Sequence, residues 1–167
     1  MMSDRCNRTA EGRAFTLVEI LVVVVILALI AGLVIPMVVD TDDLRATAAA
    51  RMVATDLQYA QNIAITTQQN VTVAFDAGEG TYALSNASGA LIHPMKKTAF
   101  TIDLNGEDGW ERVELVSASF GGGATVTFDE LGAPSSAGTV TVKAGGMIYQ
   151  ISVAAATGRV TVMTVEP

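Results

Sequence analysis

The chain has 167 residues, of which 50% are hydrophobic and 16% charged, and its formal net charge is −7. An acidic chain disfavours nucleic acid as a partner, because that binding depends on neutralising phosphates with Lys and Arg, so we expect no nucleic-acid partner. The hydrophobic residues are unevenly distributed. Residues 20–39 include no charged side chain, and residues 40–167 are about the size of one ordinary domain.

The first predicted element is an apolar helix at residues 15–39. Its twenty uncharged residues would span about 30 Å, which matches the hydrocarbon thickness of a bilayer. Three arginines lie in residues 1–14, whereas residues 40–43 hold three aspartates. Positive charge favours the cytoplasmic side, so we expect a cytoplasmic N-terminus and an exported C-terminal part. The run is too long for the core of a cleaved secretory signal, which predicts a retained single-pass transmembrane helix.

Two residues of this apolar segment need a physical explanation. Glu19 is a carboxylate within it, and a charge costs roughly 2.5–3.5 kcal/mol at a membrane helix centre and less near the interface. It either reaches the interface or pairs with a cation, for which a chain terminus is the natural candidate. Pro36 cannot donate to the Gly32 carbonyl and its ring crowds that turn. We therefore expect a kink between Gly32 and Pro36, unless the proline simply marks the membrane exit.

The helix is expected to continue beyond the membrane, over residues 40–68. Good helix formers dominate this stretch, and apolar residues recur at spacings of three or four. We predict one long helix from Phe15 to about Thr67, whose second half packs on the domain. Its predicted buried face includes Ala49, Val53, Leu57, Ala60 and Ile63 or Ala64, and its outward side chains are Arg51, Asp56, Gln58 and Gln61.

After residue 69 the apolar period changes from helical to two. Residues 71–75 and 81–85 predict a hairpin, and Gly-rich stretches separate the further apolar segments. Many short strands without an intervening helix indicate an antiparallel sandwich or strongly twisted sheets. The predicted fold class is α+β, with a long N-terminal helix packed on a β-sandwich-like domain at residues 69–167. The other predicted strands lie near residues 98–104, 112–117, 124–128, 138–143, 147–153 and 158–165.

The N-terminal sequence GRAFTLVE, residues 12–19, resembles the processing site of type IV pilins and of type II secretion pseudopilins. The resemblance implies that a prepilin peptidase cuts between Ala14 and Phe15, which removes a leader at residues 1–14. Phe15 would become the N-methylated terminus, and Glu19 would pair with the terminal amine of a neighbouring subunit. Members of the family prefer Gly before the cut, where this chain has Ala14. Pro36 matches the position of a helix-kinking proline in many members.

The domain resembles one branch of the superfamily, over residues 56–76 and 128–162. The second stretch includes Thr-Gly-Arg-Val at residues 157–160. The branch contains minor pseudopilin H of type II secretion and the minor pilin FimT, and residues 86–123 remain unassigned. The resemblance implies a structural subunit of a periplasmic pseudopilus, anchored in the inner membrane, that contacts other pseudopilins through its N-terminal helix. The alternative is a minor type IV pilin that primes pilus assembly or takes part in adhesion or DNA uptake.

Catalytic and metal-binding residues are sparse. His93 is the single histidine and precedes Pro94 in a predicted loop, so we expect a surface residue and neither a Ser-His-Asp site nor a multi-histidine metal site. The acidic stretch 103–111 lacks the spacing of a twelve-residue calcium loop and is interpreted as a turn. We therefore predict no metal, no cofactor and no enzymatic activity, which leaves a membrane-anchored enzyme as the weakest hypothesis.

Overall fold

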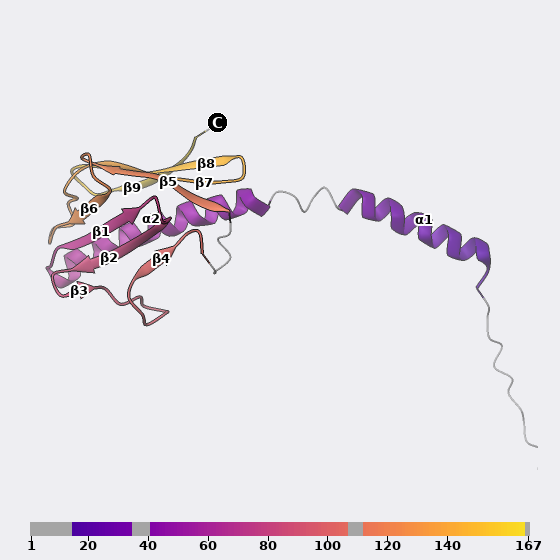
Figure 1. The fold of residues 1–167 in the computed structure, drawn as a ribbon, viewed down its shortest axis with the longest axis horizontal. Coiled ribbons are helices and arrows are strands. Elements are labelled where there is room, and N and C mark those ends of the chain that lie inside the picture. The colour runs from indigo at the N-terminus through magenta and orange to yellow at the C-terminus, as the bar shows by residue number, and fades with distance from the viewer. Residues whose placement is uncertain (1–14, 35–40, 107–111, 166–167) are drawn as a thin grey trace, which may run out of the picture. The chain divides into compact units, whose positions relative to one another are not determined.

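The computed structural model describes residues 15–34, 41–106 and 112–165. The chain divides into two compact units, Met1–Val39 and Asp40–Pro167. The first unit holds helix α1 (Leu17–Val34), and the second holds helix α2 (Thr41–Thr67) and strands β1 to β9 (Figure 1). The single helix predicted from Phe15 to about Thr67 includes both helices and the residues between them, so its continuity stays a prediction. Residues 35–40, with Pro36, lie outside the described part.

Helix α1 is apolar on all sides. Each of its large hydrophobic side chains between Leu17 and Ile30 is about half exposed or more, from 47% at Val23 to 81% at Leu17. Within the described residues, no helix reaches the length and apolarity that crossing a membrane requires.

Helix α2 has one buried face, as its sequence predicts. Leu57 is 1% exposed and Ala60 is fully buried. The helix ends at Thr67 because Gln68 adopts a left-handed conformation (φ 52°) and the Gln69 N–H donates to the Ala64 carbonyl, as in a Schellman cap. The buried face consists of Ala46, Ala49, Ala50, Val53, Ala54, Leu57, Ala60 and Ala64.

The strands form two antiparallel sheets. The first has the order β3-β2-β1-β6, with β4 also paired to β2, and the second has the order β5-β7-β8-β9. The first sheet consists of β1 (Val71–Asp76), β2 (Thr81–Asn86), β3 (Gly89–Ala90), β4 (Thr101–Asp103) and β6 (Thr125–Phe128). The second consists of β5 (Val113–Phe120), β7 (Gly138–Ala144), β8 (Met147–Val153) and β9 (Val160–Val165).

Most predicted strands are confirmed, and two differ in extent. The strand predicted at residues 98–104 is reduced to Thr101–Asp103, because the preceding residues form a turn in which the His93 N–H donates to the Thr98 carbonyl. Strand β5 runs on to Phe120, beyond the predicted end at residue 117, and a register shift between Leu115 and Ser117 accommodates the pairing with β7. The two-residue strand β3 was not predicted.

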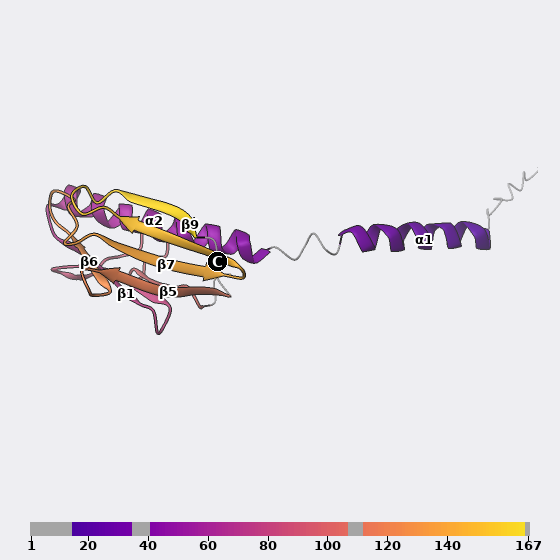
Figure 2. The ribbon, with the colours of Figure 1, turned by 90° about the horizontal axis from the view of Figure 1, so that it is seen from above.

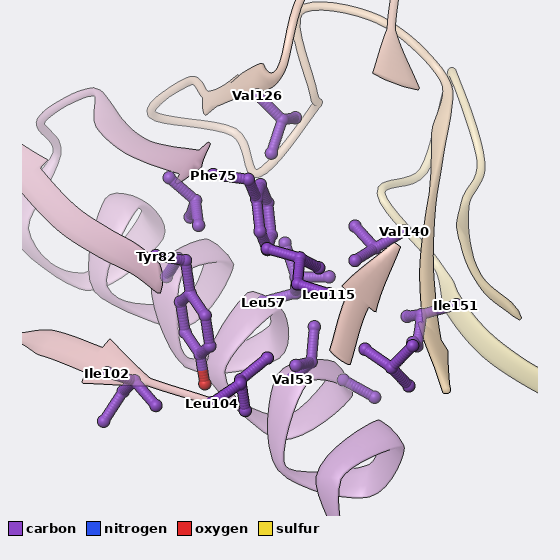
Figure 3. Close-up of a cluster of buried hydrophobic side chains, with 14 of the residues drawn as sticks. Val53, Leu57, Phe75, Tyr82, Ile102, Leu104, Leu115, Val126, Val140 and Ile151 are labelled. Carbon is purple, nitrogen blue, oxygen red and sulfur yellow. The ribbon is translucent and has the colours of Figure 1, made fainter. Parts of the chain in front are cut away.

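One hydrophobic core joins α2 to both sheets. Val53 and Leu57 of α2 lie among side chains of the first sheet, including Phe75 and Tyr82, and of the second, including Leu115 (Figure 3). Figure 2 shows the second sheet lying across α2. The α+β fold is therefore observed with antiparallel sheets. Helix α2 covers a third side of the hydrophobic core, which a plain two-sheet sandwich lacks.

Candidate functional site

The N-terminus of α1 is a capped helix start that carries Glu19. The Glu19 backbone N–H donates to the Thr16 side-chain oxygen at 3.2 Å, and the Ile20 N–H donates to the Thr16 carbonyl. Thr16 and Glu19 have the T-x-x-E spacing of a capping box, which explains why the helix begins at Leu17. A carboxylate in the first turn is also favoured by the helix dipole. The sequence contained this capping signal, and our sequence reasoning missed it.

The predicted processing residues are only partly within the described chain. Phe15 is 75% exposed and lies directly before the capping residue, and Glu19 is exposed in the first helical turn. Ala14 and Pro36 lie outside the described residues, and Gly32 belongs to the last turn of α1. Cleavage after Ala14, methylation of Phe15, the pairing of Glu19 and the kink at Gly32–Pro36 therefore stay predictions.

A polar cluster joins α2 to the first sheet. The Tyr82 hydroxyl of β2 donates to a carboxylate oxygen of Asp56 at 2.5 Å. Tyr82 is 1% exposed and Asp56 is only partly exposed, so the prediction of an outward Asp56 is wrong. The geometry fixes the rotation of α2 relative to β2, because a buried hydroxyl without an acceptor would be destabilising.

His93 lies beside this cluster and is 7% exposed, so the prediction of a surface histidine is wrong. Its Nδ1 accepts hydrogen bonds from the Met95 and Lys96 backbone N–H groups, each at 3.2 Å. Its ring packs against Phe100 with 4.6 Å between centroids. The buried His93 side chain thus stabilises the turn that follows it, which is a structural role.

The ionisation of the cluster follows from its burial. Burial raises the pKa of the Asp56 carboxyl, although the hydrogen bond from Tyr82 and the proximity of His93 act in the opposite direction. Burial also raises the pKa of the Tyr82 hydroxyl well above its usual value, and the charge of Asp56 and the hydrogen bond to it raise that pKa further. Tyr82 therefore stays a neutral donor at physiological pH.

A second polar contact joins α2 to two loops of the domain. The Gln61 side-chain amide donates to the carbonyls of Gly132, at 2.7 Å, and Thr157, at 2.9 Å. Gln61 was predicted to point outward, and this prediction is wrong. Gly158 adopts a positive φ of 62°, and a Cβ there would clash with the Gln61 side chain and lie 2.8 Å from the Gly132 carbonyl oxygen. The Thr-Gly-Arg-Val stretch therefore closes a loop against α2.

The described residues offer little for metal chemistry. Across 15–34, 41–106 and 112–165, no group of three or more His, Cys, Asp or Glu side chains is placed to hold a metal ion. The acidic stretch 103–111 includes residues 107–111, which lie outside the described part. The arrangement around Asp56, Tyr82 and Gln61 holds a helix against sheets.

The family model of the type II transport protein GspH matches residues 49–158. The chain belongs to this family. The match begins within α2 and ends at Gly158, so the GspH region includes both polar contacts of α2, the Asp56–Tyr82 bond and the Gln61 contact with the Gly132 and Thr157 carbonyls. Strand β9 and helix α1 lie outside the matched residues. No curated protein sequence matches the chain significantly.

Solved structures share the GspH fold at low sequence identity. The minor pseudopilin EpsH from the type 2 secretion system of Vibrio cholerae is 16% identical, with a TM-score of 0.54 over 74% of this chain and 98% of EpsH. The type IV minor pilin FimU of Pseudomonas aeruginosa is 17% identical, with a TM-score of 0.52 over 74% of this chain and 91% of FimU. These similarities show that the chain shares its fold with both proteins.

Proposed function

We propose that the chain is a minor pseudopilin of a type II secretion system, a structural subunit of the periplasmic pseudopilus that supports protein export across the outer membrane. The observation that carries this proposal is the match of the GspH family model over residues 49–158. The resemblance of the fold to EpsH supports it. In this proposal the chain performs no catalysis, and the prepilin peptidase and the assembly machinery are other proteins.

The N-terminal segment would act as an anchor and as an assembly element. A helix that is apolar on all sides requires apolar surroundings on all sides, which lipid and the helices of neighbouring subunits can both supply. Cleavage between Ala14 and Phe15 would leave the Phe15 amine four residues before Glu19. In a medium of low dielectric an unpaired carboxylate is costly, so Glu19 would pair with the amine of the next subunit and set its position.

The decisive experiment separates the charge of Glu19 from its capping role. Glu19→Gln keeps the capping-box residue type but removes the charge, whereas Glu19→Ala removes both. We expect both variants to be cleaved and inserted but not incorporated into filaments, which co-purification with the major pseudopilin after shearing would measure. Glu79→Ala, in the exposed turn between β1 and β2, is the matched control and should assemble normally.

The outcomes of this experiment are distinct. Normal assembly of both Glu19 variants would overturn the assembly role of the carboxylate. Assembly of Glu19→Gln but not of Glu19→Ala would assign the role to helix capping instead of charge. Mass spectrometry of the N-terminus adds a direct test, because processing predicts a species that begins at N-methylated Phe15. Full-length protein beginning at Met1 as the sole membrane species would contradict both pilin-like functions.

The second candidate is a minor type IV pilin, which the resemblance of the fold to FimU favours. A pilin that takes part in DNA uptake would bind DNA with strong salt dependence. The unit Asp40–Pro167 has its own core, so it can be assayed separately. Gene disruption distinguishes the candidates. Loss of an exported protein with intact pili supports the secretion subunit, and loss of pili with intact export supports the pilin.

A further inference from the structure

Strand β9 is the last strand of the second sheet, next to β8 (Figure 2), and no other described strand pairs with its outer edge. Its six residues, VTVMTV, include no charge, no proline and no glycine. Val162 is 38% exposed and Met163 is 53% exposed, although successive side chains of a strand point to opposite faces. Neither face of β9 is therefore fully covered.

The other sheet edges in the described chain are each protected. Strand β5 carries Glu114 and an irregularity between Leu115 and Ser117, and bulges and charges both discourage pairing. Strand β6 is covered by its following loop, since the Ser135 N–H donates to the Thr127 carbonyl at 2.7 Å. Strands β3 and β4 are only two and three residues long. Among the residues that the structure describes, β9 has no charged side chain, no register irregularity and no loop bonded along its outer edge.

The register of β8 and β9 determines which backbone groups face outward. The Ala154 N–H donates to the Arg159 carbonyl, and hydrogen-bonded and non-hydrogen-bonded pairs alternate along an antiparallel ladder. The backbone groups of the odd-numbered residues of β9 therefore face β8. Those of Val160, Val162 and Thr164 face the open edge, with Val162 at the centre.

We propose that β9 pairs antiparallel with β9 of a second copy of this chain, about a twofold axis at Val162. In this register Val162 lies opposite its counterpart, and Val160 lies opposite Thr164 of the second copy. All three outward residues then form hydrogen-bonded pairs, each exchanging two hydrogen bonds. The strand is self-complementary because these residues are evenly spaced about the axis, as an isologous interface requires. Two chains of net charge −7 can meet there because β9 brings no like charges together.

A cysteine cross-link tests the pairing on the full-length chain in detergent. Cys6 is the sole native cysteine, so Cys6→Ser gives a clean background. Val162→Cys should form an intermolecular disulfide, because Cα atoms of a hydrogen-bonded pair are about 5.5 Å apart, within disulfide range. The matched control is Val116→Cys, which replaces an exposed valine on β5, at the opposite edge of the same sheet. We expect cross-linking at Val162 to be at least about tenfold faster, because pairing raises the effective concentration of the thiols.

A second substitution removes the pairing without removing the strand. Thr164→Pro in the Val162→Cys background deletes an outward N–H, and a sheet tolerates proline at an edge position of this kind. We expect it to reduce the cross-linking rate to that of the Val116 control, with an unchanged circular dichroism spectrum and unfolding midpoint. A folded Thr164→Pro variant that cross-links as before would overturn the proposal.

Two other results would also overturn it. Equal cross-linking rates for Val162→Cys and Val116→Cys would show that β9 does not pair preferentially with β9 of a second copy. Cross-linking of Val162→Cys in cells to a different protein, with no dimer of this chain, would assign the edge to another partner. The pairing requires neither cleavage before Phe15 nor a pseudopilus, so its failure would leave the proposed function intact.

Discussion

Helices α1 and α2 contain similar numbers of apolar residues, but they differ in how far those side chains are buried. In α1 the apolar side chains surround the axis and all those described are exposed within this chain, whereas α2 buries one face against two sheets. The buried face of α2 is mostly alanine, which allows the helix backbone to approach the strands closely. The comparison teaches that α2 is buried by the sheets of its own unit, whereas the described apolar side chains of α1 are not buried within theirs.

The largest effect on stability should come from the buried face of α2. Leu57→Ala leaves a cavity in the shared core and should lower the free energy of unfolding by about 2–5 kcal/mol. Leu27→Ala makes the same change in α1 and should alter the unfolding of the domain by less than about 0.5 kcal/mol. Urea unfolding followed by circular dichroism measures both. Similar losses for the two variants would contradict the division of roles between the helices.

A smaller effect should come from the loop that Gln61 holds against α2. Gly158→Ala introduces a Cβ at positive φ, against the Gln61 side chain and the Gly132 carbonyl, and should lower the free energy of unfolding by about 1–3 kcal/mol. Gly146→Ala is the matched control, because a Cβ there meets nothing within 4 Å. Thermal unfolding of the two variants compares them directly. If Gly158→Ala were as stable as the control, the close packing of this loop on α2 would be unimportant.

The smallest effect is a pH dependence at the Asp56–Tyr82 contact. Because the folded state raises the pKa of Asp56, its contribution to stability is fully present below the unfolded value of 3.8 and is lost as pH rises through the folded pKa. Asp56→Asn still accepts the Tyr82 hydrogen bond but cannot ionise. Its stability relative to the wild type should therefore increase between about pH 3 and about pH 7, as urea unfolding would measure.

The control for this pH dependence is Glu114→Gln, which removes an exposed carboxylate on β5. Its stability should follow that of the wild type across the same pH range. If Asp56→Asn also remained parallel to the wild type, the carboxyl would not be titrating in the folded state as its burial implies.

The predictable parts of the fold were those with local periodicity. The buried face of α2 and the hairpin of β1 and β2 were both found, because spacings of three or four and of two directly reflect helix and strand geometry. Asp56 and Gln61 were misplaced because they flank the apolar face, where a polar residue can point either way. Their partners lie 26 and 71 or more residues away in the chain, so no local pattern contained the contact.

The sequence by itself determined the chemistry of the N-terminal segment, because an uninterrupted apolar stretch, a T-x-x-E cap and a lone carboxylate are local properties of neighbouring residues. It also indicated the family, through motifs that are contiguous in the chain. Only the tertiary structure decided that His93 is buried, that Gln61 holds two loops and that β9 has an open edge. These features depend on which strands become neighbours and which remain at an edge, and strand order is set by packing around α2 rather than by local periodicity.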